Sequence, residues 1–435
     1  MSNDKPNIKQ METSITAEAI KKAGSYRWSV CALLFFATTI NYIDRQVFGI
    51  LAPVLQKEIG WNEIDYGYIV TAFTAAYAIG LLFVGRFIDK VGTKIGYTVS
   101  LIVWSFAAMG HALVNTVFGF GAARFALGLG ESGNFPAAIK ATAEWFPKKE
   151  RAYATGLFNS GANIGAVVAP LIVPWITLTW SWRVAFIFTG LLGFIWLALW
   201  IWLYEVPERQ KRVTKEEIAY IQSDPVEVIT EKVPWLKLLK YRQTWAFIVG
   251  KFLTDPIWWF YLYWLPKFLN ERYHLDLANL GLPLIVIYTM TSVGSIGGGW
   301  LSGYFIKKGW SINKGRKAVM LISAVLIVPI VFASTVPEWW AVLLIGLAAA
   351  SHQSWSANLF TTVSDMFPKK AVGSVTGIGG MAGAIGGMLI ATATGFILQI
   401  TGSYLSLFIL AGVIYLVALF IFNLLVPKIK EFEIA

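Results

Sequence analysis

The sequence predicts an all-α membrane protein with twelve transmembrane helices in two six-helix halves and with both termini cytoplasmic. Of its 435 residues, 56% are hydrophobic and only 14% are charged, whereas a soluble domain carries about 25% charged residues. Apolar stretches of about 20 residues recur from Trp28 to Pro427, and each is long enough to cross a hydrocarbon core about 30 Å thick. The basic residues lie in short loops between these stretches, which favours a membrane protein over a nucleic-acid-binding one despite a net charge of +11.

The apolar stretches place the helices, and the loop charges orient them. Lys and Arg gather in the N-terminal tail and in the second-to-third, fourth-to-fifth, eighth-to-ninth and tenth-to-eleventh loops, while the opposite loops near Asn115, Thr179, Pro337 and Thr401 carry almost none. Basic loops remain in the cytoplasm, so both termini are expected there. The expected helices are 28–53, 66–88, 95–115, 118–141, 151–176, 182–205, 244–269, 280–305, 317–335, 338–362, 371–397 and 403–426.

Two sequence segments repeat and divide the chain into halves. Phe146-Pro147-Lys148-Lys149 recurs as Phe367-Pro368-Lys369-Lys370, and Gly85–Lys90 recurs as Gly303–Lys308, in the same order. Duplicated halves that face each other suit alternating access, with a binding site at their interface. The expected regions are an N-terminal cytoplasmic tail (1–26), an N-terminal six-helix bundle (27–205), a cytoplasmic linker (206–243), a C-terminal six-helix bundle (244–426) and a cytoplasmic tail (427–435).

The residue types present argue against several classes of protein. Cys31 is the only cysteine, so we expect no intrachain disulfide and a role in packing. Three histidines and one cysteine form no metal-ligand pattern, and no phosphate-binding loop is present. An enzyme and an ATP-driven pump are therefore not expected, and neither are a cofactor, a bound metal or an obligatory protein partner. Residues 1–25 have no apolar core of a cleavable signal peptide.

Charged residues inside the expected helices are the candidates for function. A charge at the centre of a membrane helix costs about 2.5–3.5 kcal/mol, so such side chains are expected to face a cavity or each other. Arg124 and Glu131 are two helical turns apart and share a face, whereas the neighbours Asp44 and Arg45 point about 100° apart. The charged residues are Asp44, Arg45, Arg124, Glu131, Lys251 and Asp255, and His352 lies in another span.

These charges predict an anion site coupled to protons. A guanidinium offers paired donors to a carboxylate, so we expect Arg45 to bind an anionic solute. Arg124 either does the same or holds Glu131 or Asp44. If an arginine leaves its carboxylate for the solute, that carboxylate loses its counter-charge and takes up a proton, which couples the two. Asp44 and Glu131 are therefore the proton-coupling candidates, and the alternative is an ion-pair network with no transport role.

Other polar and aromatic side chains are expected to complete a pocket for a hydroxylated solute. Lys251, Asp255 and Trp258 share one face of the seventh helix, although Lys251 and Asp255 alternatively pair with each other. The tenth helix is polar for a membrane span, and His352 is expected to be structural. Trp196, Trp200 and Trp202 are expected to face lipid or the membrane interface. The predicted solute-binding residues are Arg45, Arg124, Tyr42, Tyr77, Lys251, Trp258, Gln353, Ser354 and Asn358.

Several motifs resemble a known transporter family over nearly the whole chain. The pattern Gly85-x-x-x-Asp89-Lys90-x-Gly92-x-Lys94 resembles the signature loop of the major facilitator superfamily. A resemblance to the anion:cation symporter branch of this superfamily lies in Asn41–Arg45, Gly130–Pro136 and Glu144–Arg151. Within that branch, a resemblance to bacterial hexuronate transporters lies in Gly92–Tyr97, Phe158–Ala166 and Lys251–Pro256. The second half departs from the signature loop, because Lys307 stands in the place of Asp89.

The resemblance implies a function and a location. It implies a secondary active transporter that imports a hexuronate, of the glucuronate or galacturonate type, by proton symport in a bacterial inner membrane. The alternatives are a proton-coupled carrier of another sugar acid such as an aldonate, a carrier of another small organic anion, or sodium coupling. The partners would be the anion, protons and membrane lipid. The gating residues implied are Gly85, Asp89, Lys90, Gly92, Lys94, Glu144 and Arg151.

Overall fold

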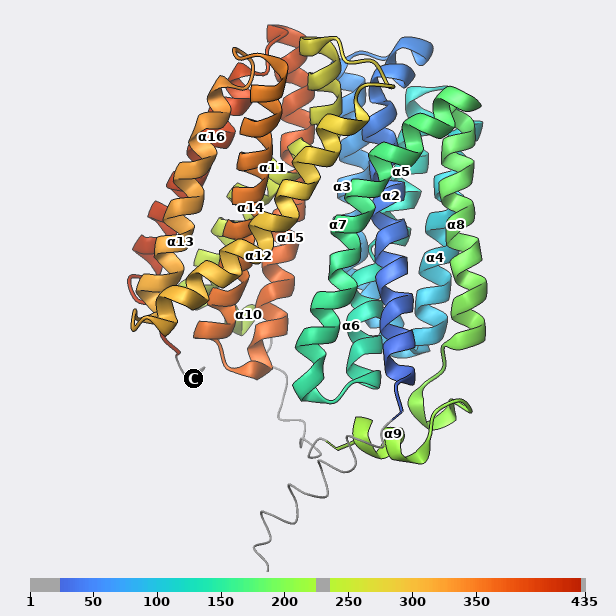
Figure 1. Cartoon of the computed structure of the whole chain (residues 1–435), viewed down its shortest axis with the longest axis vertical. Helices are drawn as coiled ribbons and strands as arrows, with labels where there is room; N and C mark the ends of the chain where they lie inside the picture. Colours follow the sequence, from blue (N-terminus) through green and yellow to red (C-terminus); the bar gives the residue numbers. More distant parts are fainter. Residues whose placement is uncertain (1–23, 224–234, 432–435) are drawn as a thin grey trace, which may run out of the picture.

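The protein is a bundle of long helices that run roughly along one direction (Figure 1). The computed structural model describes residues 24–223 and 235–431, and within these ranges all regular secondary structure is helical. The first half contains α2 (Tyr26–Ile59), α3 (Glu63–Val91), α4 (Thr93–Gly110), α5 (Val117–Glu131), α6 (Asn134–Trp145), α7 (Lys148–Thr179), α8 (Trp182–Leu203) and α9 (Lys215–Ile221). The second contains α10 (Trp235–Leu238), α11 (Arg242–Tyr273), α12 (Gly281–Lys307), α13 (Ile312–Ile327), α14 (Glu338–Met366), α15 (Lys369–Thr401) and α16 (Leu405–Leu425). Short 3₁₀ turns occupy His111–Leu113, Pro207–Arg209 and Val328–Phe332.

The expected helical ranges coincide with these helices to within several residues, with one break. The stretch expected at 118–141 consists of α5 and α6, which are separated at Ser132 and Gly133. Pro136 explains the break, because it has no N–H to donate to the carbonyl of Ser132 and its ring crowds that carbonyl. The hydroxyl of Ser132 donates to the carbonyl oxygen of Leu129 at 2.7 Å.

Eight helical segments in the described parts of the chain are long and apolar enough to cross a membrane. The other long helices, α2, α11 and α14, carry the charged and polar side chains. They carry Asp44 and Arg45, Lys251 and Asp255, and the polar stretch around His352. Charged residues are tolerated at membrane depth where protein surrounds them. These side chains lower the mean hydropathy of the three helices, and their burial in the protein explains how they are tolerated.

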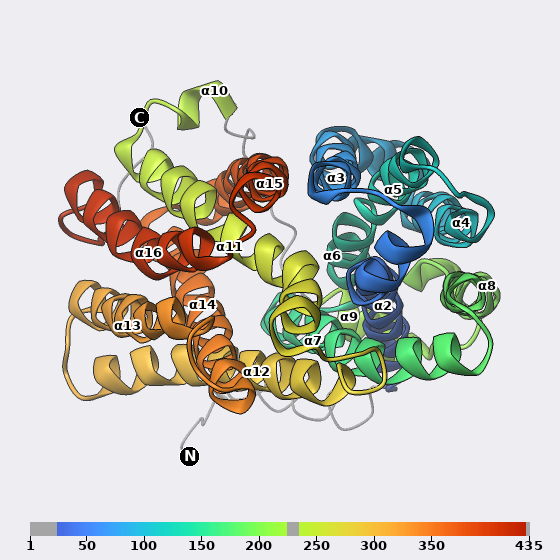
Figure 2. The same ribbon diagram turned by 90° about the horizontal axis from the view of Figure 1, so that it is seen from above.

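The helices form two groups that lie side by side, α2–α8 on one side and α11–α16 on the other (Figures 1 and 2). The groups meet most closely at the end where α2 and α11 finish, which is the upper end in Figure 1. There a Cβ on Gly67 of α3 would lie 2.9 Å from the carbonyl oxygen of Ala391 and 3.3 Å from Cα of Gly395 on α15. α2 packs against α11 and α7 against α12 at the same end.

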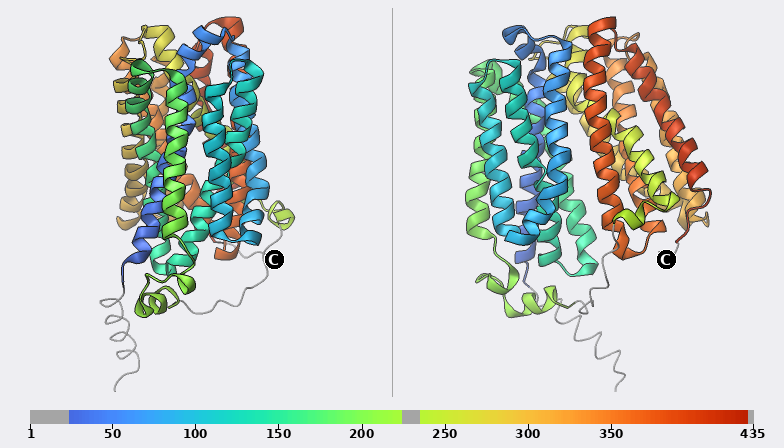
Figure 3. Two further views of the ribbon diagram at one scale, coloured as in Figure 1. Left: turned by 90° about the vertical axis from the view of Figure 1, so that its right-hand side faces the viewer. Right: turned by 180° about the vertical axis from the view of Figure 1, so that it is seen from behind.

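At the other end the same two helices stand apart. Gly85 follows Gly67 by eighteen residues, or about five helical turns, and so lies on the same face of α3. Gly373 precedes Ala391 by the same interval on α15. Nothing lies within 4 Å of a Cβ built on either Gly85 or Gly373. The halves therefore converge at the upper end and diverge toward the lower end, as the view from behind also shows (Figure 3, right).

The repeated sequence segments adopt matching structures. Pro147 and Pro368 stand immediately before α7 and α15, with φ/ψ of −63°/151° and −61°/148°. Each proline supplies an extended residue before a helix of similar length, 32 residues in α7 and 33 in α15. The internal repeat read from the sequence is thus reproduced in the backbone, and it puts α7 and α15 in equivalent places in the two halves.

The tryptophans of α8 do not all face outward as the sequence suggested. Trp202 is exposed, but Trp196 and Trp200 are buried. The indole N–H of Trp196 donates to the carbonyl oxygen of Leu33 on α2 at 2.8 Å, and Trp200 stacks on Tyr204. The prediction was wrong for these two because one helix of a bundle presents only part of its circumference to lipid, and hydropathy carries no orientation. Cys31 is buried as predicted.

The stretch expected as a linker (206–243) is partly helical and docks on the first half. It contains α9 and α10, α11 begins within it at Arg242, and residues 224–234 lie outside the described ranges. Glu217 of α9 is buried and accepts hydrogen bonds from the backbone N–H and the guanidinium of Arg27. Arg27 also pairs with Glu150 at 2.9 Å. Most of the expected N-terminal tail and the end of the expected C-terminal tail likewise fall outside the described residues, at 1–23 and 432–435.

The packing of α5 on α4 gives a stability test. A Cβ on Gly130 would lie 2.5 Å from the backbone nitrogen of Trp104, whereas one on Gly121 of the same helix would meet nothing within 4 Å. Gly130→Ala is expected to destabilise the protein by about 1–3 kcal/mol, because backbone must move to admit the methyl group. Thermal unfolding of the purified protein in detergent measures this. Gly121→Ala is the matched control and is expected to unfold close to the wild-type temperature; equal behaviour of the two variants would contradict the packing.

Candidate functional site

A buried ion pair occupies the middle of the first half. Arg45 of α2 donates from Nε and Nη2 to Oε2 of Glu131 at 2.9 and 2.8 Å, and both side chains are almost completely buried. Nη2 also lies 3.4 Å from Oδ1 of Asn41. The second oxygen of Glu131 is buried without a partner in the described part of the chain. The pair therefore neutralises its charges but keeps one acceptor free.

Aromatic rings enclose the guanidinium of Arg45. Four ring centroids lie 4.9 to 5.5 Å from its central carbon, a range in which cations are attracted to ring faces. We call these rings the aromatic cage: Tyr42, Phe73, Tyr77 and Trp259. Trp259 belongs to α11, so the cage includes a residue from the second half. Arg45 consequently faces the boundary between the two halves.

Arg124 lies beside this cage without a carboxylate partner among the described residues. Its Nη2 reaches only the carbonyl oxygen of Arg45 at 3.4 Å, and Nε and Nη1 are buried without hydrogen bonds. The rings of Phe48, Phe73 and Tyr263 surround its guanidinium, with centroids at 4.5, 4.9 and 5.3 Å. A guanidinium keeps its charge in proteins. Arg124 is therefore a buried positive charge with donors available to an anion.

The pairing differs from the sequence expectation in one respect. Arg124 was expected to hold Glu131 or Asp44 if it did not bind solute, yet Glu131 pairs with Arg45. Arg124 and Glu131 do share a face of α5, but α2 crosses that face at Arg45, which stands between them. The position of α2 relative to α5 decides the pairing, and the sequence of α5 alone does not contain it.

Asp44 points away from the boundary between the halves. It is buried, and the side chains of Trp104 on α4 and Thr189 on α8 approach its carboxyl group without forming a hydrogen bond of normal geometry. Its neighbour Arg45 points toward α5 and α11. The structure thus separates the two adjacent side chains as their helical spacing requires, and only Arg45 reaches the cage.

The second half contributes a smaller set of the predicted residues. Lys251 and Asp255 of α11 form an ion pair at 2.7 Å. Trp258 stacks on His352 of α14 with centroids 5.4 Å apart, and His352 also contacts the hydroxyl of Tyr415 at 2.6 Å. Trp258 therefore does not join the aromatic cage, and its neighbour Trp259 does. His352 has the buried, hydrogen-bonded setting expected of a structural histidine.

The predicted residues of α14 mainly join helices. The hydroxyl of Ser354 bonds to Ser323 of α13 at 2.9 Å, and the amide of Asn358 donates to the carbonyl oxygen of Gly298 on α12 at 3.1 Å. Gln353 is half-buried. Polar groups in membrane helices commonly bridge neighbouring helices. Ser354 and Asn358 act in this way here and do not meet Arg45.

The gating residues implied by the resemblance belong to the first half and contact other residues of that half. Asp89 pairs with Lys140 of α6 at 3.1 Å, Lys94 pairs with Glu205 at 3.1 Å, and Glu144 accepts a hydrogen bond from Thr93 at 2.7 Å. Gly92 joins α3 to α4 with a φ of 88°, a conformation that favours glycine. The remaining gating residues lie near this turn: Gly85 and Lys90 on α3, and Arg151, which donates to the carbonyl oxygen of Phe146 at 2.8 Å.

An ion pair that the sequence did not single out joins the halves at the upper end. Lys267 of α11 is buried and forms a very close contact with the carboxylate of Glu63, the first residue of α3. Gln56 donates to the same oxygen at 3.0 Å. Glu271, one turn along α11, lies 3.5 Å from Lys267. A charged side chain near a helix end is common in membrane proteins, so only the structure reveals that this one crosses between halves.

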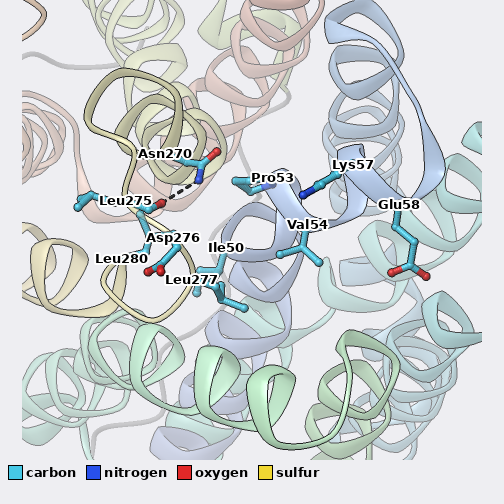
Figure 4. A pocket seen from close by; sticks show the side chains of 10 residues that line it. All are labelled: Ile50, Pro53, Val54, Lys57, Glu58, Asn270, Leu275, Asp276, Leu277 and Leu280. Carbon is cyan, nitrogen blue, oxygen red and sulfur yellow. Dashed lines mark hydrogen bonds between the residues drawn. The ribbon is translucent and has the colours of Figure 1, made fainter.

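A cavity of about 660 Å³ opens between the end of α2 and the connection from α11 to α12. Residues from the end of α2, including Pro53 and Lys57, face the α11–α12 connection across it (Figure 4). On the far side Asn270 donates to the carbonyl oxygen of Leu275 at 2.8 Å. Ile50 on its wall follows Arg45 by more than one helical turn, so the cavity lies above the aromatic cage and is separate from it.

Comparison with known proteins decides the family. The profile of the Major Facilitator Superfamily matches residues 34–391. This chain belongs to that superfamily. A bacterial homologue of the human lysosomal transporter Spinster, solved in an inward-facing and occupied conformation, has the same fold, with a TM-score of 0.75 at 16% identity over 93% of this chain and 98% of that one. The chain is therefore a multi-pass integral membrane transporter and not an enzyme.

Curated relatives in the superfamily carry names at the level of substrate. A hexuronate transporter of Escherichia coli (strain K12) is 33% identical over 88% of this chain and 90% of its own length. A galacturonate transporter of Dickeya chrysanthemi is 33% identical over 71% and 90%. A probable galactarate/D-glucarate transporter of Escherichia coli (strain K12) is 28% identical over 97% and 98%. The resemblance of this transporter to hexuronate carriers is thereby confirmed.

The buried pair of this transporter can be tested without any substrate. Glu131→Ala is expected to destabilise the protein by about 3–5 kcal/mol, because Arg45 is left as an uncompensated buried charge. Replacing both partners in Arg45→Met/Glu131→Met removes that charge and is expected to recover most of the loss. Thermal unfolding of the purified variants distinguishes the two. If the double variant were less stable than Glu131→Ala, charge compensation would not be what the pair supplies.

Proposed function

We propose that this chain imports a hexuronate, of the glucuronate or galacturonate type, by proton symport with alternating access. The observation that carries the proposal is the arrangement of two buried guanidinium groups, one paired with Glu131 and one with unused donors, at the boundary between the halves. The names of the relatives that are 33% identical support the substrate class. The proposed location is a bacterial inner membrane.

The proposed topology has twelve membrane helices and both termini in the cytoplasm. Eight meet the criteria of length and apolarity, and α2, α5 with α6, α11 and α14 complete the set with their charged and polar residues turned inward. The proposed bundles are 27–205 and 244–426, joined by the linker 206–243. Basic residues in alternate loops support this orientation. The upper end of Figure 1 is then periplasmic, and the halves diverge toward the cytoplasm.

The proposed mechanism exchanges the partners of the arginines. The carboxylate of the solute binds the free donors of Arg124 and draws Arg45 from Glu131. Glu131, deprived of its counter-charge, takes a proton, so proton and anion binding favour each other. Tyr42 and Tyr77 supply hydroxyl groups and ring faces beside Arg45. Asp44 is a second candidate proton site within the first half, and the energy source is the proton gradient.

Proton coupling at Glu131 is tested by Glu131→Gln in proteoliposomes. Glutamine cannot carry a proton, so accumulation of glucuronate or galacturonate driven by a pH gradient is expected to be lost. Counterflow exchange of the same solute is expected to persist, because exchange needs no net proton movement. Radiolabelled uptake in both modes measures this. Accumulation equal to wild type would assign the proton to another residue, and the absence of both modes in the wild type would reject the substrate class.

Alternating access requires the Lys267–Glu63 contact to break when the transporter opens to the periplasm. Glu63→Gln removes the charge that joins the halves and leaves Lys267 to pair with Glu271 within the second half. The variant is expected to open more often at that end. Thr71 of α3 bonds across the boundary between the halves to Thr392 of α15 at 2.7 Å. Thr71→Cys in a Cys31→Ser background therefore reports the opening by labelling with a membrane-impermeant maleimide.

Glu63→Gln is expected to speed this labelling several-fold from the periplasmic side. Glu58→Gln is the matched control, because Glu58 pairs with Arg183 inside the first half at 3.1 Å. Its labelling rate is expected to equal that of the parent protein. Unchanged or slower labelling of the Glu63→Gln variant would show that this ion pair does not hold the periplasmic side closed.

A further inference from the structure

A second buried ion pair faces the aromatic cage from the other half. Lys251 and Asp255 are one turn apart on α11, with Nζ and Oδ2 separated by 2.7 Å. The lysine side chain is 7% exposed and its ammonium lies 4.2 Å from the ring centroid of Phe360. The aspartate side chain is 18% exposed. The lysine is therefore covered by protein, while part of the carboxylate remains accessible.

The helical register turns Asp255 toward the boundary between the halves. Asp255 and Trp259 are four residues apart and share a face of α11, and Trp259 lies against Arg45 and Tyr77. Asp255 is also within electrostatic range of Tyr42 on α2. A solute held at Arg45 would extend about one helical turn, 5.4 Å, along α11 to reach Asp255.

Two glycines of α15 leave room for this face. A Cβ on Gly383 would lie 2.2 Å from Oδ2 of Asp255, and one on Gly387 would lie 2.4 Å from the ring of Trp259. Any larger residue at Gly383 would displace the carboxylate. The position of Asp255 is thus set by its lysine on one side and by the backbone of α15 on the other.

The chemistry of this pair distinguishes two kinds of sugar acid. An ionised carboxylate only accepts hydrogen bonds, so Asp255 can receive hydroxyl groups of a solute but not a second carboxylate. Lys251 is already paired and covered, so it does not offset a further negative charge. Like charges in a partly desolvated site repel strongly. A solute with one carboxylate at the arginines and hydroxyls at its far end fits both groups, whereas a dicarboxylate places its second charge against Asp255.

We propose that Asp255, positioned by Lys251, makes this transporter selective for monocarboxylic over dicarboxylic sugar acids. The inference rests on the proposed function, because it takes the first carboxylate to bind at Arg45 and Arg124. It also separates the two classes of substrate named among the relatives, hexuronates and the aldarates galactarate and glucarate.

Binding of a matched pair of solutes to the purified full-length protein tests the proposal. Galacturonate and galactarate share the configuration of C2 to C5 and differ at C1, which is the hemiacetal carbon of a ring in galacturonate and a second carboxylate in the open-chain galactarate. The wild type is expected to bind galacturonate at least about tenfold more tightly, a difference of about 1.4 kcal/mol. Asp255→Asn leaves the charge of Lys251 unpaired and is expected to shift the ratio of affinities toward galactarate by about tenfold or more. Lys251→Gln removes the ammonium that positions Asp255 and keeps its carboxylate ionised, so the preference for galacturonate is expected to weaken.

A control and a second variant guard against structural effects. Asp365→Asn breaks another partly buried ion pair of the second half, with Arg316 at 3.0 Å, and is expected to leave the ratio unchanged. If Asp255→Asn cannot be purified, Lys251→Gln/Asp255→Asn replaces the pair by neutral groups of similar shape. That variant is expected to lose most of the preference.

The outcomes that overturn the proposal are distinct from failure of the proposed function. Wild-type protein that binds galactarate as tightly as galacturonate rejects selectivity at Asp255 but leaves sugar-acid transport in place. Equal weakening of both solutes by Asp255→Asn assigns the pair a purely structural role and also rejects it. If the wild type binds neither solute, the proposed function itself fails.

Discussion

The contact between Arg45 and Glu131 is the constraint around which the first half is arranged. A lone charge at this depth would be costly, and even a paired one needs its remaining hydrogen-bonding groups placed with care. Four aromatic rings and the packing of α3 against α5 provide that setting. A Cβ on Gly128 of α5 would lie 2.4 Å from the carbonyl oxygen of Phe73, so the glycine brings α5 close to α3, the helix that carries Phe73 and Tyr77 of the cage. The packing of the helices and the pairing of the charges at the site thus depend on each other.

The same pair depends on the contact between the halves. Trp259 of α11 supplies one wall of the cage around Arg45, and Tyr263, one turn further on, covers Arg124. Above them, Tyr66 donates to the carbonyl oxygen of Tyr263 at 2.6 Å, and Lys267 meets Glu63. Any movement that separates α11 from α2 and α3 therefore uncovers both arginines to water and changes what it costs to keep them charged. The charge state of the site and the conformation of the molecule are linked through a single helix.

The helices and the buried charged residues could be predicted from the sequence, but the orientation of each helix about its own axis could not. Apolar stretches and the repeat of Phe146-Pro147 at Phe367-Pro368 are local patterns, so the helices and the two halves could be read directly. Buried charges are conspicuous because the membrane makes them rare. Trp258 was named from the sequence, whereas Trp259 is the residue that lies against Arg45, because the two side chains point about 100° apart and only the packing of α11 on α14 and α15 selects between them. The pairing of Arg45 with Glu131, 86 residues apart, likewise depends on helix packing.

The two halves repeat in backbone but differ in the charges they bring to the boundary. The first half presents two guanidinium groups and one carboxylate there, a local excess of positive charge. The second presents Lys251 and Asp255, which cancel, with the carboxylate as the more exposed member. In the proposed mechanism one half attracts the anion, and the other limits how much negative charge the solute carries. Because the proposed favourable and unfavourable groups lie on different halves, both would act on a solute only when the halves close around it, so selection would depend on the same contact as the proposed conformational change.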